Sequence, residues 1–177
     1  MQKSFRLIAA LTVIGMGIWG ARMLFPSPEQ AIRSRLLNLA RTLSFERKDG
    51  ILSRGLKAQN FLECFTLDVV VSLDSRAYGA RTLTGRDELQ QALLVALNHE
   101  AAGGLKVEFL DINVTLGPDK QTAVADLTAK ATVTGERDFL VQEFNFMLKK
   151  ADGQWLIYRV ETVKTLSRRE VFRRIPV

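Results

Sequence analysis

Few residues of this chain have side chains suited to nucleophilic or metal chemistry. The chain has one cysteine, Cys64, and one histidine, His99. Cys64 lies in the apolar stretch FLECF, where we expect a buried and unreactive thiol, since a nucleophilic thiolate needs a basic neighbour. The sequence offers no Cys/His metal set, no glycine-rich phosphate loop and no serine–histidine–aspartate arrangement. We therefore expect no metal ion and no cofactor.

Acid–base chemistry remains, and its candidate residues are Asp68, Glu143 and Tyr158. Such a reaction needs a base and a hydrogen-bond donor that are directed into one pocket. All three residues lie on expected strands, but each also has a simpler explanation. Asp68 can be a solvated residue near the start of a strand, Glu143 can pair with a cation across the sheet, and Tyr158 can be a buried residue with one hydrogen bond. The sequence thus names three weak catalytic candidates and favours a domain that is not an enzyme.

The net charge of +6 lies mainly at the two ends of the chain. Lys3, Arg6 and Arg22 fall within the first 26 residues, which contain no acidic residue, and four arginines follow Ser167. Residues 27–167 are nearly neutral. Because nucleic-acid-binding modules usually carry their positive charge on the folded surface, we expect no nucleic-acid partner. The basic ends suit an anionic lipid surface or, for the tail, a solvated segment.

An apolar run from Leu7 to Phe25 predicts a single membrane-spanning helix within residues 1–26. Its length of about 19 residues is close to the roughly 20 that cross a bilayer. Lys3 and Arg6 precede it, which favours a cytoplasmic N-terminus and a domain on the outer side, periplasmic or extracellular. The arginines that follow the run weaken this orientation. A cleaved signal peptide and a soluble buried helix remain as alternatives.

The next segment carries the signals of an α+β domain over residues 27–166. Ser27, Pro28 and Gln30 match a helix N-cap, a first-turn proline and a capping box. Helical patterns cover residues 29–48, 53–65 and 84–100, and strand patterns cover residues 66–74, 107–116, 122–133, 139–149 and 155–166. Short turns join the long strands, so we expect a curved antiparallel sheet packed against about three helices. A basic tail, residues 167–177, follows.

Two details of the expected strands bear on a pocket. The apolar phase switches near Phe109 and Leu110, which predicts a β-bulge. Between Ala123 and Ala131, small residues alternate with polar ones. Small side chains that face a pocket leave space in it, whereas small side chains that face helices only permit close packing. The sequence leaves both possibilities open.

The order of these elements resembles that of the nuclear transport factor 2-like superfamily, which includes ketosteroid isomerase and the SnoaL-like polyketide cyclases. The resemblance covers about residues 28–166. It is carried by the opening helix, by the strand LDVVVSL after FLECF, by the glycine that opens the helix in TGRDELQQAL, and by the final strand in GQWLIYRVETV. It implies a cystatin-like cone with a pocket between sheet and helices. In this superfamily the pocket can bind a small molecule, catalyse a reaction or be filled, and the fold alone does not choose between these.

The resemblance also bears on catalysis. The isomerases carry a tyrosine on the first helix, whereas the apolar face of the first helix here consists of Ile32, Leu36, Leu39 and Leu43. The donor that would stabilise an oxyanion is therefore missing from its place in this chain. Asp68 lies in an Asp-Val dipeptide that is common in the family, so it keeps its place among the candidates.

We therefore expect a membrane-anchored, non-enzymatic domain that acts by protein association or scaffolding. Residues 7–25 would contact the membrane, and the resemblance adds a homodimer through the open face of the sheet. The alternative is a domain that binds a small apolar ligand or lipid in the cone. An enzyme of the isomerase, cyclase or hydratase type is the least favoured possibility.

Overall fold

The computed structural model describes residues 27–46, 49–75, 79–99, 104–135 and 139–166. The expected membrane anchor and the basic tail lie outside these residues. Within the described part of the chain, no helix is both long and apolar enough to cross a membrane.

The first helix, α2, spans Pro28–Leu43 and begins as the sequence predicts. The Ser27 hydroxyl accepts a hydrogen bond from the amide of Gln30, and the Gln30 side chain accepts one from the amide of Ser27. The predicted end at residue 48 is wrong, because Ser44 is already extended. The next residue, Phe45, pairs with Leu105 at the start of a strand. This pairing with the sheet replaces the last turn that helical periodicity alone suggests.

Two further helices, α3 (Ile51–Leu62) and α4 (Gly85–His99), follow along the chain. Helix α3 begins after Gly50 rather than at Ser53, and it stops before the predicted end at Phe65. Phe65 instead opens a strand, and the carbonyl of Cys64 accepts a hydrogen bond from the amide of Ile157. Sheet pairing therefore sets the end of α3, as it sets the end of α2.

Six strands form one sheet in the order β2-β1-β6-β5-β4-β3. Their bounds are β1 Phe65–Ser75, β2 Gly79–Thr84, β3 Leu105–Leu116, β4 Thr122–Val133, β5 Phe139–Ala151 and β6 Gln154–Leu166. Strands β3 to β6 form the expected antiparallel meander, whereas β1 pairs with β6 in parallel. The parallel pair corrects the expectation of a wholly antiparallel sheet, but the α+β class is confirmed.

Strand β2 was not predicted from the sequence. It has six residues, of which only Leu83 is buried, so it lacks the apolar alternation that indicates a strand. The predicted bulge in β3 is confirmed, because the pairing with β4 shifts between Leu110 and Asn113. At this point Asp111 adopts a positive φ of 52°.

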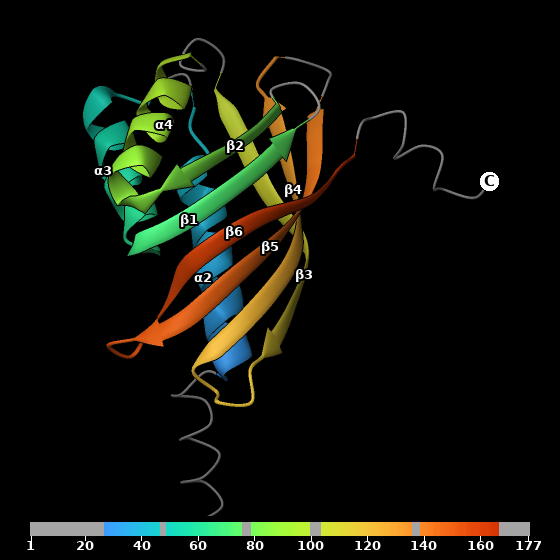
Figure 1. Ribbon diagram of the computed structural model, residues 1–177. Helices are drawn as coiled ribbons and strands as arrows, with labels where there is room; N and C mark the ends of the chain where they lie inside the picture. Colours follow the sequence, from blue (N-terminus) through green and yellow to red (C-terminus); the bar gives the residue numbers. More distant parts are fainter. Residues whose placement is uncertain (1–26, 47–48, 76–78, 100–103, 136–138, 167–177) are drawn as a thin grey trace, which may run out of the picture.

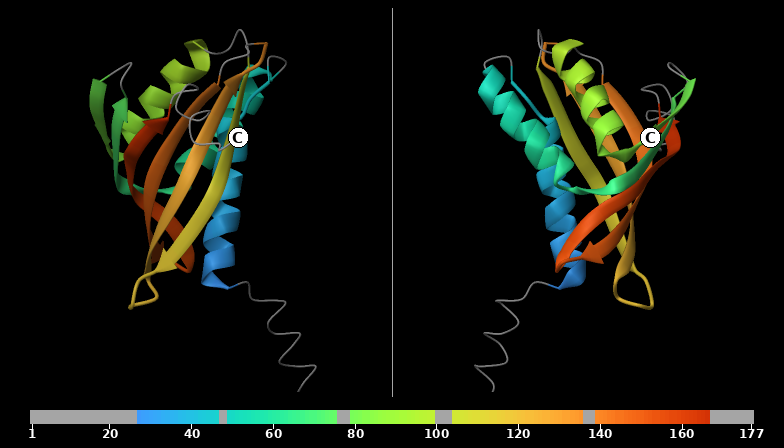
Figure 2. Two further views of the ribbon diagram at one scale, coloured as in Figure 1. Left: turned by 90° about the vertical axis from the view of Figure 1, so that its right-hand side faces the viewer. Right: turned by 60° about the vertical axis from the view of Figure 1, so that its left-hand side comes forward.

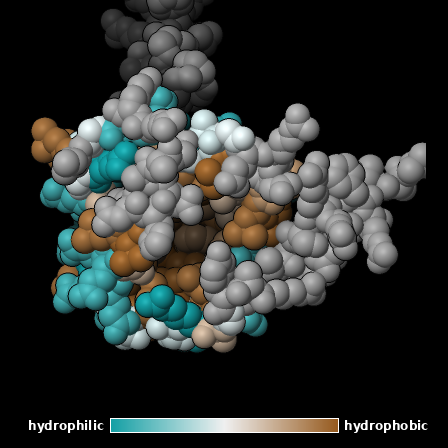
Figure 3. Space-filling model, turned by 90° about the horizontal axis from the view of Figure 1, so that it is seen from above, coloured by the Kyte–Doolittle hydropathy of each residue, from teal (hydrophilic) through white to brown (hydrophobic). Residues whose placement is uncertain are grey.

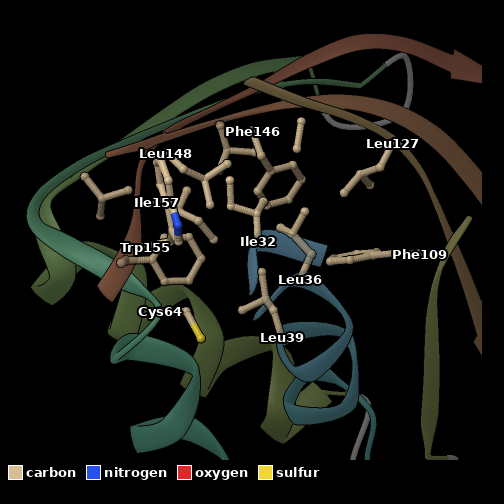
Figure 4. Packing of buried hydrophobic residues seen from close by; sticks show 14 of the residues in the cluster. Ile32, Leu36, Leu39, Cys64, Phe109, Leu127, Phe146, Leu148, Trp155 and Ile157 are labelled. Carbon is tan, nitrogen blue, oxygen red and sulfur yellow. The ribbon is translucent and has the colours of Figure 1, made fainter. Parts of the chain in front are cut away.

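The sheet curves around the helices, which lie on its concave side (Figures 1 and 2). Helix α2 contributes Ile32, Leu36 and Leu39 to the main core, and all three are almost completely buried. In the close-up these side chains lie among residues of the sheet such as Phe109 and Phe146, whose ring centroids are 5.7 Å apart (Figure 4). The core therefore fills the space between α2 and the concave face of the sheet.

Candidate functional site

On the central strands the concave side of the sheet is closed at one end and accessible at the other, whereas on the edge strand β3 Val114 and Leu116 are only partly buried at the closed end as well. At the end where β4 and β6 begin, Ala125, Leu148 and Ile157 are fully buried, at 0% exposure. Toward the end where β3 begins and β4 finishes, the apolar residues packed against the core are only partly buried. These residues are Leu43, Leu73, Leu93, Val107, Ala129 and Phe144. We call this accessible end the mouth of the cone.

The strand register places the side chains of the mouth on the inner face. Ala129 is in phase with the buried Ala125 and Leu127, and it pairs with Phe109 on β3. On β5, Phe144 is likewise in phase with the buried Phe146. Because side chains alternate between the two faces of a strand, these residues point toward the helices. Seen from above, this end of the molecule has a recess with hydrophobic residues in it (Figure 3).

The alanines of β4 therefore serve both purposes that the sequence left open. Ala123 and Ala125 are buried in the main core, where their small size permits close packing. Ala129 and Ala131 are only partly buried, and their small size leaves space near the mouth.

One polar side chain is buried on this inner face. Gln142 on β5 is 6% exposed, and its amide nitrogen donates a hydrogen bond to the carbonyl of Asp74 at 3.4 Å. Gln142 pairs with Ala129 across β4, which places it beside the mouth residues. Its amide oxygen has no hydrogen-bond partner among the described residues, so it is available as an acceptor. Sequence reasoning missed Gln142, although its position in phase with Phe144 and Phe146 was a usable signal.

Asp68 and Tyr158 lie together, but on the outer face of the sheet. The Nζ atom of Lys149 is 3.7 Å from the Asp68 carboxylate and 5.8 Å from the centre of the Tyr158 ring. Lys149 follows the fully buried Leu148 on β5 and so points to the opposite face. The neighbouring Thr66 hydroxyl and the charge of Lys149 lower the pKa of the Asp68 carboxyl. With a side chain 75% exposed and a lowered pKa, Asp68 is poorly suited to act as a general base at neutral pH.

Glu143 lies elsewhere on the outer face. It lines a shallow depression of about 270 Å³ together with Asp111 and Asp126. Lys149 lies six positions farther along β5, which corresponds to about 20 Å along an extended strand. The three catalytic candidates therefore do not form one site, and none of them faces the cone.

Cys64 and His99 are the remaining residues with chemically reactive side chains. Cys64 is buried as predicted, and desolvation raises the pKa of its thiol. His99 is the last residue of α4, and its side chain lies outside what the structure describes. Within the described ranges, no group of three or more His, Cys, Asp or Glu residues could hold a metal ion.

A larger groove of about 770 Å³ lies at the edge of the sheet, where Ser44 to Glu46 run beside the start of β3. Leu105, Val107 and Phe45 contribute apolar surface, and Arg41 and Lys106 lie at the rim. Arg41 is exposed on the side of α2 opposite to its buried residues, and Lys106 alternates with the inward-facing residues of β3. The groove therefore opens at the β3 edge of the sheet and shares Val107 with the mouth of the cone.

The helices on a curved six-stranded sheet define a cystatin-like α+β cone. The chain belongs to the SnoaL-like domain family, which matches residues 53–161. No curated protein matches the chain.

Solved structures share the fold at low sequence identity. A cystatin-fold domain of unknown function from Nostoc punctiforme is 16% identical with a TM-score of 0.62, and 84% of each chain is covered. A nuclear transport factor 2-like protein from Novosphingobium aromaticivorans is 16% identical with a TM-score of 0.62, covering 81% of this chain and 86% of that one. A proposed scytalone dehydratase from the same organism is 20% identical with a TM-score of 0.55, covering 78% of this chain and 85% of that one. At these identities the likeness concerns the fold alone.

Proposed function

We propose that this domain is a binding module whose cone takes a small, largely apolar molecule through its mouth. The observation that carries the proposal is the change in burial along the inner face. Side chains of the same phase are fully buried at one end, whereas Val107, Ala129 and Phe144 remain partly exposed at the other. Apolar surface that is concave and accessible is the usual wall of a small-molecule site.

Gln142 gives this site one polar contact. Its amide nitrogen is engaged by the Asp74 carbonyl, which fixes the orientation of the amide. The amide oxygen can then accept a hydrogen bond from a hydroxyl or N–H group of the ligand. The preferred ligand is therefore an apolar molecule with a single donor group.

The arrangement supports binding rather than catalysis. An acid–base reaction needs a base and a donor directed at the same substrate. Asp68, Glu143 and Tyr158 lie on the outer face of the sheet, and the inward residues of α2 are Ile32, Leu36, Leu39 and Ala40. A dehydratase activity, named for one structural neighbour, lacks such a pair among the described residues of this cone.

Binding of a fluorescent apolar probe tests this proposal. The full chain should enhance the fluorescence of N-phenyl-1-naphthylamine, a neutral probe, with saturation at one site. Ala129→Phe fills the mouth and should abolish the enhancement. Val163→Phe adds the same ring at an exposed position that lines the outer depression and should leave it unchanged. Equal binding by both variants and the natural chain would place the probe outside the cone and refute the proposal.

A second candidate function is protein association at a membrane. The apolar run from Leu7 to Phe25 supports a single-pass anchor, with the N-terminus in the cytoplasm and the domain on the outer side. Exposed apolar residues on the outer sheet face, namely Leu110, Val124 and Val163, support a homodimer through that face.

Fractionation and sedimentation test this second candidate. The full chain should sediment with membranes, and a chain that begins at Ser27 should not. In detergent the full chain should sediment as a dimer, and Val124→Glu should make it monomeric. A full chain that stays in the soluble fraction, or a dimer that Val124→Glu leaves intact, would count against the anchor or the interface respectively.

A further inference from the structure

The two edge strands of the sheet, β3 and β2, differ in how many of their outward backbone groups bond to other residues of the chain. At the β3 edge, Phe45 and Leu105 exchange two backbone hydrogen bonds of 2.8 Å. Farther along the same edge, the Ser44 hydroxyl accepts from the amide of Val107, and Arg33 donates to the carbonyl of Ile112. Residues of the same chain therefore engage backbone groups of Leu105, Val107 and Ile112 on this edge strand.

The opposite edge, β2, is left open over most of its length by the described residues. The amide of Thr84 donates to the Glu88 carboxylate at 2.7 Å and so points away from β1. Pairing between β1 and β2 has no register shift, and the backbone groups of a strand face the same side at every second residue. The amides and carbonyls of Ala80 and Thr82 therefore also point outward. Both residues are exposed, and the structure shows no partner for these groups in the described part of the chain.

A groove runs between this open edge and helix α4, which lies next to β2 (Figures 1 and 2). Its volume is about 510 Å³. Leu83, Ala92 and Val95 give it an apolar side, and Glu88 and Gln91 of α4 add polar groups. Arg81 and Thr82, which alternate on β2, both line it. Since residues that alternate between the two faces of β2 line it, the groove follows the edge where an added strand would lie.

We propose that this groove is a peptide-binding site, in which an extended segment of another protein adds to β2 as an antiparallel strand. The outward backbone groups of Ala80 and Thr82 supply the main-chain hydrogen bonds, and the groove takes alternate side chains of the peptide. The site lies outside the cone, so it goes beyond ligand binding there and does not depend on it.

The side chains of the groove define the peptide that fits. Arg81 and Leu83 lie on the same face of β2, two residues apart. Glu88 also lines the groove, but its carboxylate accepts from the amide of Thr84 and forms no ion pair with Arg81 in the described part of the chain. In an antiparallel strand, the residue opposite Leu83 precedes the residue opposite Arg81 by two positions. The preferred segment therefore has an apolar residue followed two positions later by an aspartate or glutamate.

The same charge argument disfavours a second copy of this chain as the occupant. Strand β2 has the sequence GARTLT and contains no acidic residue. A β2–β2 pair would leave both copies of Arg81 without a carboxylate on the added strand. A peptide that carries an acid two positions after its apolar residue provides this partner.

Fluorescence anisotropy with the full chain tests the site. The probe is a labelled seven-residue peptide that alternates threonine with valine and carries one glutamate two positions after its central valine. Thr82→Pro removes an outward amide without removing a bond to β1, and it should weaken binding about tenfold, as expected for one lost hydrogen bond. Thr82→Val keeps the amide and serves as the matched control, which should bind like the natural chain. Circular dichroism verifies that both variants are folded.

A charge exchange gives a second test that does not depend on proline. Arg81→Glu should lose affinity for the glutamate peptide and gain affinity for the same peptide with lysine in place of glutamate. Binding that neither Thr82→Pro nor Arg81→Glu alters would overturn the proposal, as would the absence of binding to the natural chain. A dimer of the natural chain that Thr82→Pro dissociates, together with no peptide binding, would show that the occupant is a second copy.

Discussion

The side-chain amide of Gln142 donates a hydrogen bond to the carbonyl oxygen of Asp74, with 3.4 Å between the two atoms. The bond links β5 to the end of β1, although β6 lies between these strands in the sheet. Gln142 thereby does two things at the mouth of the cone. It links two strands that are not neighbours in the sheet, and its amide oxygen has no hydrogen-bond partner among the described residues.

Replacement of Gln142 by leucine tests the polar contact. The natural chain should bind 2-naphthol more tightly than 2-methylnaphthalene, because only the former has a hydroxyl that can donate to the amide oxygen. In Gln142→Leu this preference should fall by about tenfold, the value of one hydrogen bond. Competition against N-phenyl-1-naphthylamine measures both affinities. An unchanged preference would show that Gln142 does not contact the ligand.

Two neighbouring leucines of α2 should differ sharply in their contribution to stability. Leu36 is fully buried in the main core, whereas Leu37 is 40% exposed. We expect Leu36→Ala to lower the free energy of unfolding by about 2–5 kcal/mol, because it leaves a cavity. Leu37→Ala should change it by less than about 1 kcal/mol. Urea denaturation measures both values, and similar losses in the two variants would contradict the core described above.

The Ser44 hydroxyl should stabilise the end of α2 and the edge of the sheet at once. It accepts from the amide of Val107 at 2.9 Å and lies 2.9 Å from the carbonyl of Ala40. Ser44→Ala leaves the Val107 amide without this partner and should cost about 1–3 kcal/mol of unfolding free energy. Ser34→Ala, at an exposed position of the same helix, is the control and should have little effect. Thermal unfolding of the two variants measures this difference in stability.

The fold was predictable where local signals and tertiary contacts agree. The capping box correctly located the start of α2, and the alternation of small apolar and polar residues correctly located β4. The predicted ends of α2 and α3 were wrong because Phe45 and Phe65 pair with the sheet. Helical periodicity in the sequence carries no information about such contacts. Strand β2 was missed because a short, exposed edge strand has no apolar alternation.

The candidate site was less predictable than the fold. Asp68 and Tyr158 were candidates by residue type, but the face on which a residue lies depends on register and on bulges. Pairing between β5 and β6 shifts twice, between Glu143 and Phe144 and between Met147 and Leu148. Gln142 was overlooked because one polar residue in an apolar strand looks like an interruption until its neighbours are known.

The ion pair between Asp49 and Lys57 should make stability depend on pH in the acidic range. Their side chains are 2.6 Å apart, and the hydrogen bond from Lys57 lowers the pKa of the Asp49 carboxyl. A lowered pKa in the folded state means that the stabilisation is present above the unfolded value of about 3.9 and is lost as pH falls through the folded value. Asp49→Asn should therefore reduce stability at pH 7 and make its decline below about pH 4 less steep.

Urea denaturation at a series of pH values measures this dependence. Asp126→Asn is the control, since Asp126 has no ion pair among the described residues. If Asp49→Asn and Asp126→Asn followed the same pH curve as the natural chain, the Asp49–Lys57 pair would not contribute to stability.

The most direct test of ligand binding in the cone is a methyl NMR titration of the full chain with N-phenyl-1-naphthylamine. Binding in the cone should shift the signals of the methyl groups of Leu93, Val107 and Ala129, which lie at the mouth. The signals of Val124 and Val163, on the outer face of the sheet, should not shift. Shifts confined to the outer face, or no saturable shifts at all, would show that the cone is not an accessible ligand site.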